Sequence, residues 1–419
     1  MVEQTETTID FNAEANALRD ELVQRRRDFH QYPELAFEEV RTSGIIASEL
    51  QNIGLEVQIG IAKTGVVAIL EGTEDGPTIL YRADMDALPI TEQNEHDFVS
   101  LNAGKMHACG HDGHMAVGLA VAKIMHKHRD KIKGRIKFVF QPGEEGAGGA
   151  LAMIKDGILD DEPIPDYSFG IHLWQPLELG KVGVAKGAIM SGSSTFHITV
   201  KGKGGHAAMP HQAVDPVLCT GQLISALHAM VGRRMNAMDG AVVLSVTGLH
   251  TSSMKHNIIP ETVEIVGTFR TFNAYTSELL EQHIRDVSRS VCESMGCTAD
   301  VKVKHLNIPT VNNPDVVNRM RGAMLRVLDI TKLDKTITTM ASEDMSFLLE
   351  DIPGMFFLVG CRDPKNEAHQ YGHHHPKFDW DENALTTATA VVTNALADFL
   401  IYNEEAEKRE IPVELLIDE

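Results

Sequence analysis

The chain has 419 residues, of which 43% are hydrophobic and 23% charged, and its formal net charge is -21. This length exceeds the roughly 250 to 300 residues that one hydrophobic core serves, so two domains are expected, and the composition excludes a disordered or fibrous chain. The acidic balance disfavours nucleic acids and acidic membranes as partners, because phosphate binding needs clustered lysine and arginine.

The first residues and the cysteines favour a cytoplasmic protein. The start, MVEQTETTIDFNAEA, is polar and acidic, unlike a secretory signal, and no run approaches the roughly 20 apolar residues that cross a bilayer. The five cysteines are odd in number and irregularly spaced, which is not a disulfide framework. We expect reduced thiols in the cytoplasm, with every cysteine except Cys109 buried as a small hydrophobic side chain.

The first part of the chain alternates strands with helices. Apolar residues at helical spacing predict a helix over 41–53, with Gly54 as its C-cap. The elements expected after it are strands over 55–61, 64–72 and 78–84, a buried helix over 115–128, a strand over 135–141, a helix over 148–157 and a strand over 167–174. This alternation predicts a largely parallel sheet that helices cover on both faces.

The pattern changes near residue 188. The elements expected from there are a strand (194–204), a helix (215–234), two strands (241–250 and 262–272), a helix (276–296) and a strand (299–306). This β-α-β-β-α-β order is that of a ferredoxin-like α+β domain. Helical patterns over 314–328 and 383–402, around a strand at 354–360, then return the chain to the first domain. The expected fold is therefore α/β, with a catalytic domain over 1–187 and 306–419 and an inserted domain over 188–305.

Polar clusters follow several strands of the first domain. They contain Asp84 and Asp86, Cys109 and His111, Glu144 and Glu145, and His172. Ligands bind at the carboxyl ends of parallel strands, and a spacing of two places the members of the first two pairs on one side of an extended segment. Thiolate, imidazole and carboxylate together favour a transition metal such as zinc or manganese over calcium or magnesium. Adjacent glutamates point apart, so one can bind metal while the other carries a proton.

Seven short segments occur in a fixed order between about residue 27 and residue 400, and their combination is more specific than any one of them alone. They are RADMDALP, MHACGHDGH, FQPGEEGAGGA, GIHLW, GKGGHAAMPH, NIIPE and HHPKFDWDE. Together they resemble the signature segments of the dimetal amidohydrolase and carboxypeptidase family that contains hippurate hydrolases, N-acyl-amino-acid aminohydrolases and plant auxin-conjugate hydrolases.

The resemblance implies a site with two divalent metal ions per subunit, zinc or manganese, with cobalt or nickel also compatible. The implied ligands are Cys109, His111, Glu145, His172 and His374. Glu144 is implied as the general base. The last ligand is chosen from three consecutive histidines, because in related sequences it stands two residues before the proline of an H-x-P segment, here Pro376.

Three carboxylates near these ligands are expected to support them. More distant relatives carry a ligand histidine in a His-x-Asp segment where this chain has Asp84 and Asp86, and here Cys109 with His111 takes over that duty. We expect the Asp86 carboxylate to accept the second N–H of a ligand imidazole, and Asp112 is a candidate for the same task. The alternative is that Asp84 and Asp86 only end a strand.

The inserted domain is expected to act as a lid and a dimerisation domain. His206 matches a histidine that relatives offer to the scissile carbonyl oxygen, often from the partner subunit, so a homodimer or dimer-based oligomer is expected. Asn257 and Arg270 are expected to contact the substrate, although Arg270 fits a solvent-facing strand residue equally well. In the first domain, His30 and Glu34 are expected only to cap or pack.

The implied function is hydrolysis of the amide bond of an N-acyl amino acid by a water that bridges the two metals. Glu144 would take the proton of that water, and His206 would stabilise the oxyanion. A metallo-carboxypeptidase acting on short peptides and an N-acetyl-diaminopimelate deacetylase would use the same site. From other classes, a hydrolase with Cys109 as nucleophile and a non-catalytic binding protein remain as alternatives.

Overall fold

The computed structural model describes residues 8–418, which form two compact units. The first unit runs to Gly187 and includes Val311–Ile337 and the chain from Phe347 onward; the second consists of Ala188–Thr310 and Thr338–Ser346. The sequence had assigned residues 338–346 to the first domain. They join the second unit because the Thr339 amide donates to the Ile189 carbonyl at 2.9 Å, a contact between residues distant in sequence.

The first unit is built on an eight-stranded mixed sheet. The strands lie in the order β1 (Glu56–Ile61), β2 (Gly65–Glu71), β4 (Lys133–Gln141), β3 (Glu74–Asp84), β5 (Tyr167–Glu178), β16 (Gly354–Arg362), β6 (Val182–Gly183) and β15 (Leu333–Asp334). The central strands β4, β3, β5 and β16 pair in parallel, whereas β1, β2 and β4 pair antiparallel, as do β16 and β6. The predicted fold class, α/β with a mainly parallel sheet, is confirmed.

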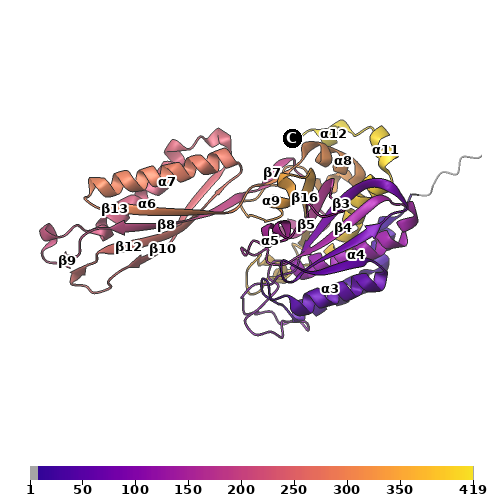
Figure 1. Cartoon of the computed structure of the whole chain (residues 1–419), viewed down its shortest axis with the longest axis horizontal. Coiled ribbons are helices and arrows are strands. Elements are labelled where there is room, and N and C mark those ends of the chain that lie inside the picture. Colours follow the sequence, from indigo (N-terminus) through magenta and orange to yellow (C-terminus); the bar gives the residue numbers. More distant parts are fainter. Residues whose placement is uncertain (1–7, 419) are drawn as a thin grey trace, which may run out of the picture. The chain divides into compact units, whose positions relative to one another are not determined.

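Helices cover this sheet and close its core. They are α1 (Phe11–Ala17), α2 (Arg19–Gln31), α3 (Val40–Ile53), α4 (His111–Lys127), α5 (Gly149–Lys155), α8 (Pro314–Met324), α9 (Ser346–Glu350), α10 (Ala384–Leu400), α11 (Asn403–Lys408) and α12 (Val413–Leu416). Helices α4 and α10 pack on each other and on the central strands; α4 is labelled in Figure 1. Both are buried along most of their length, as expected of helices that lie between a sheet and further helices.

The second unit is a four-stranded antiparallel sheet with two helices on one face (Figure 1). Its elements are β8 (Gly192–Lys201), α6 (Pro216–Arg234), β10 (Val242–Thr251), β12 (Thr262–Thr271), α7 (Ala274–Ser294) and β13 (Thr298–Asn307). The spatial order β10-β12-β8-β13 confirms the predicted ferredoxin-like arrangement. Short strands β9 (Gly205–His206) and β11 (Ile258–Ile259) pair beside it, and β7 (Gly187–Met190) and β14 (Thr310–Asn312) lie where the chain passes between the units.

Among residues 8–418, no helix combines the length and the apolar character that a membrane crossing requires.

Candidate metal centre

The start of helix α4 carries the first two metal-binding candidates. The helix begins at His111, four residues before the predicted start, and its N-cap Gly110 has φ 93°. This left-handed conformation favours glycine. Cys109 and His111 are therefore not on one side of an extended segment, as the sequence reasoning assumed. The turn at Gly110 brings them to the same site instead.

Five side chains from four separate segments come together near the carboxyl end of β4, the middle of β5, the start of α4 and the loop that carries His374. Donor atoms of Cys109, His111 and His172 lie within 4.8 Å of one another, and so do those of Cys109, Glu145 and His374. The Cys109 Sγ is 3.4 Å from His172 Nε2, and His374 Nε2 is 3.2 Å from Glu145 Oε1. These are the five predicted ligands, and Cys109 belongs to both groups.

Backbone carbonyls orient two of the imidazoles. His111 Nδ1 is 2.8 Å from the carbonyl of Asp86, and His172 Nδ1 is 2.9 Å from the carbonyl of Leu173. Donation from Nδ1 to a carbonyl directs the Nε2 of each ring at the site. His111 Nε2 is buried and makes no hydrogen bond among the described residues, and its nearest carboxylate oxygen, from Asp84, is 3.6 Å away. A buried nitrogen without a hydrogen bond fits a metal ligand, because leaving a buried polar atom unsatisfied is costly.

Electrostatics at the site also suit a cation. Burial lowers the pKa of His172 well below its ordinary value, which keeps the imidazole neutral and able to bind metal. Burial opposes protonation of His111 as well, but Asp84 and Asp86 outweigh it and raise the pKa to about 10. Burial, reinforced by Glu145 and Glu144, raises the pKa of Cys109 well above that of a free thiol. Without a nearby cation this sulfur is a neutral thiol and a poor nucleophile.

The three consecutive histidines have different surroundings. His373 accepts from the Gln175 amide at 3.2 Å and stacks on an indole ring, whereas His375 accepts from the Lys377 amide at 3.0 Å. His374 is the one that joins Cys109 and Glu145. Its φ of 65° is left-handed, which is uncommon for a non-glycine residue and is concentrated at functional sites.

Asp86 supports the site differently from the prediction. We expected its carboxylate to hold an imidazole, but the backbone carbonyl has the shorter contact to His111, and the nearest carboxylate oxygen is 3.5 Å from Nδ1. The carboxylate accepts instead from the backbone amides of Glu144 and Glu145, at 3.0 Å each. Asp86 therefore fixes the turn that presents both glutamates, of which Glu144 is buried.

Asp84 does more than end a strand. It is fully buried, accepts from Arg82 at 2.7 Å and lies 2.6 Å from His114 Nδ1. Burial opposes its ionisation, but His111, Arg82 and His114 hold the pKa of the carboxyl well below its usual range. The other nitrogen of His114 accepts from the Leu173 amide at 2.8 Å. With both nitrogens engaged, His114 is a bracing residue of the site rather than a metal ligand.

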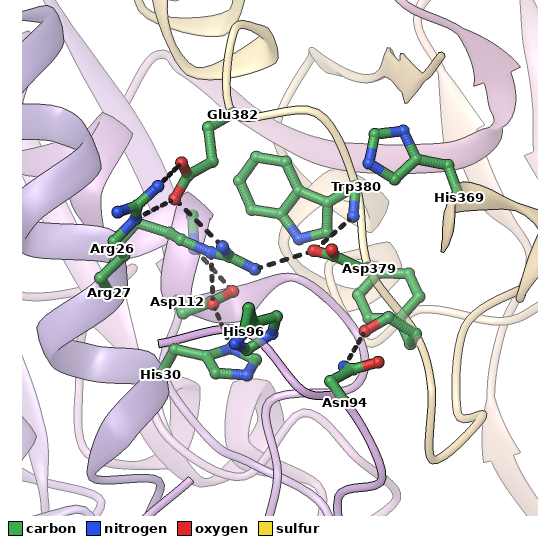
Figure 2. A network of polar contacts seen from close by, with 12 residues as sticks. Arg26, Arg27, His30, Asn94, His96, Asp112, His369, Asp379, Trp380 and Glu382 are labelled. Atoms are coloured by element: carbon green, nitrogen blue, oxygen red, sulfur yellow. Dashed lines mark hydrogen bonds and ion pairs between the residues drawn. The ribbon is translucent and has the colours of Figure 1, made fainter. Parts of the chain in front are cut away.

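The expectation for Asp112 is wrong. Its carboxylate contacts none of the five predicted ligands through a hydrogen bond and receives Arg26 Nε at 2.9 Å and His30 Nδ1 at 2.8 Å (Figure 2). His30, expected to cap or pack, is fully buried, and its second nitrogen lies 3.1 Å from Glu92. The sequence signal that could have found this network is the arginine-rich helix end RRRDFH, because buried arginine and histidine need carboxylate partners. His30, Glu92 and His96 also form a group able to hold an ion, but both ring nitrogens of His30 already contact carboxylates.

The predicted residues of the second unit are in two places. His206 and Asn257 line one hollow of about 680 Å³ together with Ser252 and Glu261. His206 is exposed, and its Nδ1 accepts only from a backbone amide two residues along the chain. Arg270 lies near the carboxyl end of β12, whereas Thr262 at the start of this strand lines the hollow. Its Nη1 donates to Ser342 at 2.7 Å, so Arg270 is not the solvent-facing strand residue that the sequence allowed as an alternative. Burial lowers the pKa of Arg270.

Comparisons with known proteins agree with this geometry. The sequence model described as "Peptidase family M20/M25/M40" matches residues 80–398. An N-acetylcysteine deacetylase of Bacillus subtilis is 37% identical over 375 residues, which are 89% of this chain and 95% of the relative. An IAA-amino acid hydrolase of Arabidopsis thaliana is 35% identical over 409 residues, or 97% of this chain and 90% of the relative.

A solved structure is similar over the whole fold. A dinuclear metal-binding peptidase of the same family from Bacillus subtilis is 32% identical and has a TM-score of 0.79, with coverage of 91% of this chain and 98% of that one.

Proposed function

This chain belongs to peptidase family M20/M25/M40 and is a metal-dependent amidohydrolase or peptidase, and we propose that it hydrolyses the amide bond of N-acyl amino acids. The observation that carries the proposal is the pair of donor groups that share Cys109, with Glu144 buried beside them. Two relatives named as hydrolases of an amino acid conjugate and of N-acetylcysteine support the substrate class.

Cys109, His111, Glu145, His172 and His374 would hold two divalent ions, zinc or manganese by donor chemistry, with cobalt or nickel also compatible. When bound, such a pair of cations polarises a substrate carbonyl and makes water a stronger acid. The sulfur of Cys109 is the atom common to both donor groups, so it would help to hold both ions. Its raised pKa means that the thiolate forms when the cations bind.

Glu144 is proposed as the general base. Donor atoms of Glu144, Glu145 and His111 lie within 4.8 Å of one another, so its carboxylate is close to the metal ligands. It accepts the proton of the attacking water and later gives it to the leaving nitrogen. The Asp86 carboxylate holds the backbone of both glutamates, which keeps the base aligned with the ligand next to it.

The substrate contacts of the second unit are proposed to come from two subunits. Arg270 pairs with Ser193 at the start of β8, whereas His206 follows the other end of that strand. The eight steps along β8 from Ser193 to Lys201 span about 26 Å, so Arg270 and His206 of one chain do not reach the same small substrate. We propose a homodimer in which His206 and Asn257 serve the partner's site, His206 by stabilising the oxyanion and Asn257 by contacting the substrate carboxylate. The second unit would act as lid and dimerisation domain.

The direct test replaces Glu144 by glutamine. We expect turnover of N-acyl amino acids to fall by roughly 10²- to 10⁴-fold while the metal content per subunit is unchanged. A screen of acetyl, benzoyl and indoleacetyl amino acids, with short peptides and N-acetyl-diaminopimelate included, identifies the substrate. Full turnover by the glutamine variant on the best substrate would refute the role of Glu144. Metal binding without hydrolysis of any of these amides by the wild type would favour the binding-protein alternative.

The exchange between subunits has its own test. A Glu144→Gln subunit lacks the base and a His206→Ala subunit lacks the donor, so neither homodimer should be active. Random reassociation of the two gives hybrids with one complete site, and about a quarter of wild-type activity should return. No recovery, with hybrid dimers demonstrated by mass, would contradict a donor supplied by the partner.

The nucleophile alternative is tested with a chelator. EDTA leaves a cysteine hydrolase active, whereas we expect it to abolish activity here and added zinc or manganese to restore it.

A further inference from the structure

Figure 2 shows a buried ionic network that includes Asp112, the residue after the metal-binding candidate His111. Its hub is Arg26 on α2, which is fully buried. The guanidinium donates from Nε to Asp112 at 2.9 Å and from Nη1 to Glu382 at 3.1 Å, and its Nη2 lies 3.7 Å from Asp379. It also lies over the rings of Phe98 and Trp380, each with its centroid at 4.6 Å. Arg26 is thus held on all sides and has one orientation.

The partners of Arg26 belong to two segments that carry metal-binding candidates. Asp112 immediately follows His111 in the first turn of α4, and Asp379 and Glu382 follow His374 in the next loop. The two segments are more than 260 residues apart in sequence. Near the ligands, one backbone bond joins them, from the His374 amide to the Ala108 carbonyl at 2.8 Å. The Arg26 network is a second connection between them, farther from the ligands.

Further bonds brace the same connection. His30 lies between Asp112 and Glu92, and the loop that carries Glu92 donates from the Gln93 amide to the Pro376 carbonyl at 2.8 Å. Asn94 in that loop donates to the Phe378 carbonyl at 3.0 Å. The segment after His374 is therefore attached both to Arg26 and to the loop held by His30.

We infer that Arg26 and Asp112 are positioning residues that set the His111 end of α4 against the loop of His374, and so set the span between the two halves of the metal centre. This inference rests on the proposed function. Neither residue touches the ligands by side chain, so their effect is on the geometry of metal binding. Loss of the link should weaken metal binding by roughly 10- to 100-fold, as for other residues that orient metal ligands indirectly.

A second buried network in the same unit provides a matched control. Asp398 on α10 is fully buried and receives Arg319, at 2.8 Å, together with Arg326 and Arg409. Like Asp112, it is a buried helical aspartate that pairs with arginine, although its three arginine partners are only partly buried. Its partners are on α8, the segment after it and the C-terminal segment, none of which carries a predicted ligand. Asp398→Asn therefore removes the same charge without touching the metal centre.

The experiment compares Asp112→Asn with Asp398→Asn in the full chain. Metal affinity is measured by competition with a chromophoric chelator, and the unfolding midpoint is measured on the metal-free proteins. Both variants should unfold more easily, but only Asp112→Asn should bind zinc or manganese 10- to 100-fold more weakly. Glu382→Gln removes the partner of Arg26 on the loop after His374, at a partly exposed position. It should also weaken metal binding, and it replaces Asp112→Asn in the comparison if that variant does not fold.

Wild-type affinity in Asp112→Asn and in Glu382→Gln would overturn the inference, and so would an equal loss in the Asp398 control. This failure differs from failure of the proposed function, in which the wild type itself binds no pair of ions or hydrolyses no amide. A third readout separates positioning from general damage. At saturating metal, Asp112→Asn should recover most of its kcat, whereas a globally disordered protein would not.

Discussion

The predicted metal ligands of the first unit and the predicted substrate contacts of the second unit differ in how completely one chain surrounds them. In the first unit, the donor atoms of Cys109, His111 and His172 lie together and are buried, and backbone carbonyls orient the two imidazoles. In the second unit, His206 and Asn257 line an open hollow, and His206 is exposed. The first group is preorganised within one unit, whereas the second is open to solvent, as expected if it serves the partner subunit of the proposed dimer. Removing a residue from either group should therefore have different consequences.

Metal removal should have the largest effect and should act on the first group alone. We expect complete and reversible loss of hydrolysis after dialysis against a chelator. Because Cys109 is buried, its thiol should react with thiol reagents only after the metal-free protein has been denatured. Metal analysis and activity before and after readdition check this. Activity that survives with no metal detected would remove the distinction between the two regions.

Replacement of His374 should have the next largest effect. His374→Asn keeps the left-handed backbone, which asparagine tolerates, while it removes the imidazole. The variant should retain about one ion per subunit and lose several kcal/mol of transition-state stabilisation, about a thousandfold in turnover. The matched control is His375→Asn, which removes the neighbouring imidazole that is not a predicted ligand. Equal metal loss in both variants would show that the choice among the three histidines is wrong.

His206→Ala should have a smaller effect of another kind. We expect kcat to fall by roughly 10²- to 10³-fold, as for loss of one oxyanion donor, with the metal content and the unfolding midpoint unchanged. The unchanged midpoint follows from exposure, since the side chain adds little packing. Steady-state kinetics with metal analysis on the same sample decides the matter. A fall in metal content would place His206 with the first group.

The smallest effect concerns pH and the buried ionic network around Arg26. Burial opposes protonation of His30, but hydrogen bonds to Asp112 and Glu92 outweigh it and raise the pKa. A raised folded pKa stabilises the protein fully below the unfolded value of about 6.5, and the contribution is lost as the pH rises through the folded value. His30→Gln should therefore cost on the order of 2 kcal/mol near pH 5.5 and less at alkaline pH. Denaturant unfolding across this range checks it, and a constant difference would contradict a charged His30.

The fold was predictable from the sequence because local pattern and topology agree. Apolar strands that alternate with helices fixed the mainly parallel sheet, and the β-α-β-β-α-β order fixed the second unit. Helix α4 was predicted four residues late, because Gly110 and the polar residues after it look like a loop until burial is known. Residues 338–346 were misplaced because only tertiary hydrogen bonds assign them.

The site was predictable where residue types define the chemistry and less so where contacts define it. Residue types predicted the clusters that contain Cys109, His111, Glu145 and His172, whereas His374 and the choice between the two glutamates came from the family resemblance. The partners predicted for Asp86 and Asp112 were wrong. A carboxylate accepts equally from an imidazole, an amide or a guanidinium, and the sequence does not show which of these donors lies nearby. His30 was passed over for the same reason.

The shared anchoring of Glu144 and Glu145 has a consequence for protein engineering. One Asp86 side chain holds the adjacent amides of both residues, so the proposed proton carrier and its metal-binding neighbour move as a single block. A redesign that shifts one to suit a bulkier substrate displaces the other. New specificity is therefore easier to build from the walls around this turn than from the turn itself.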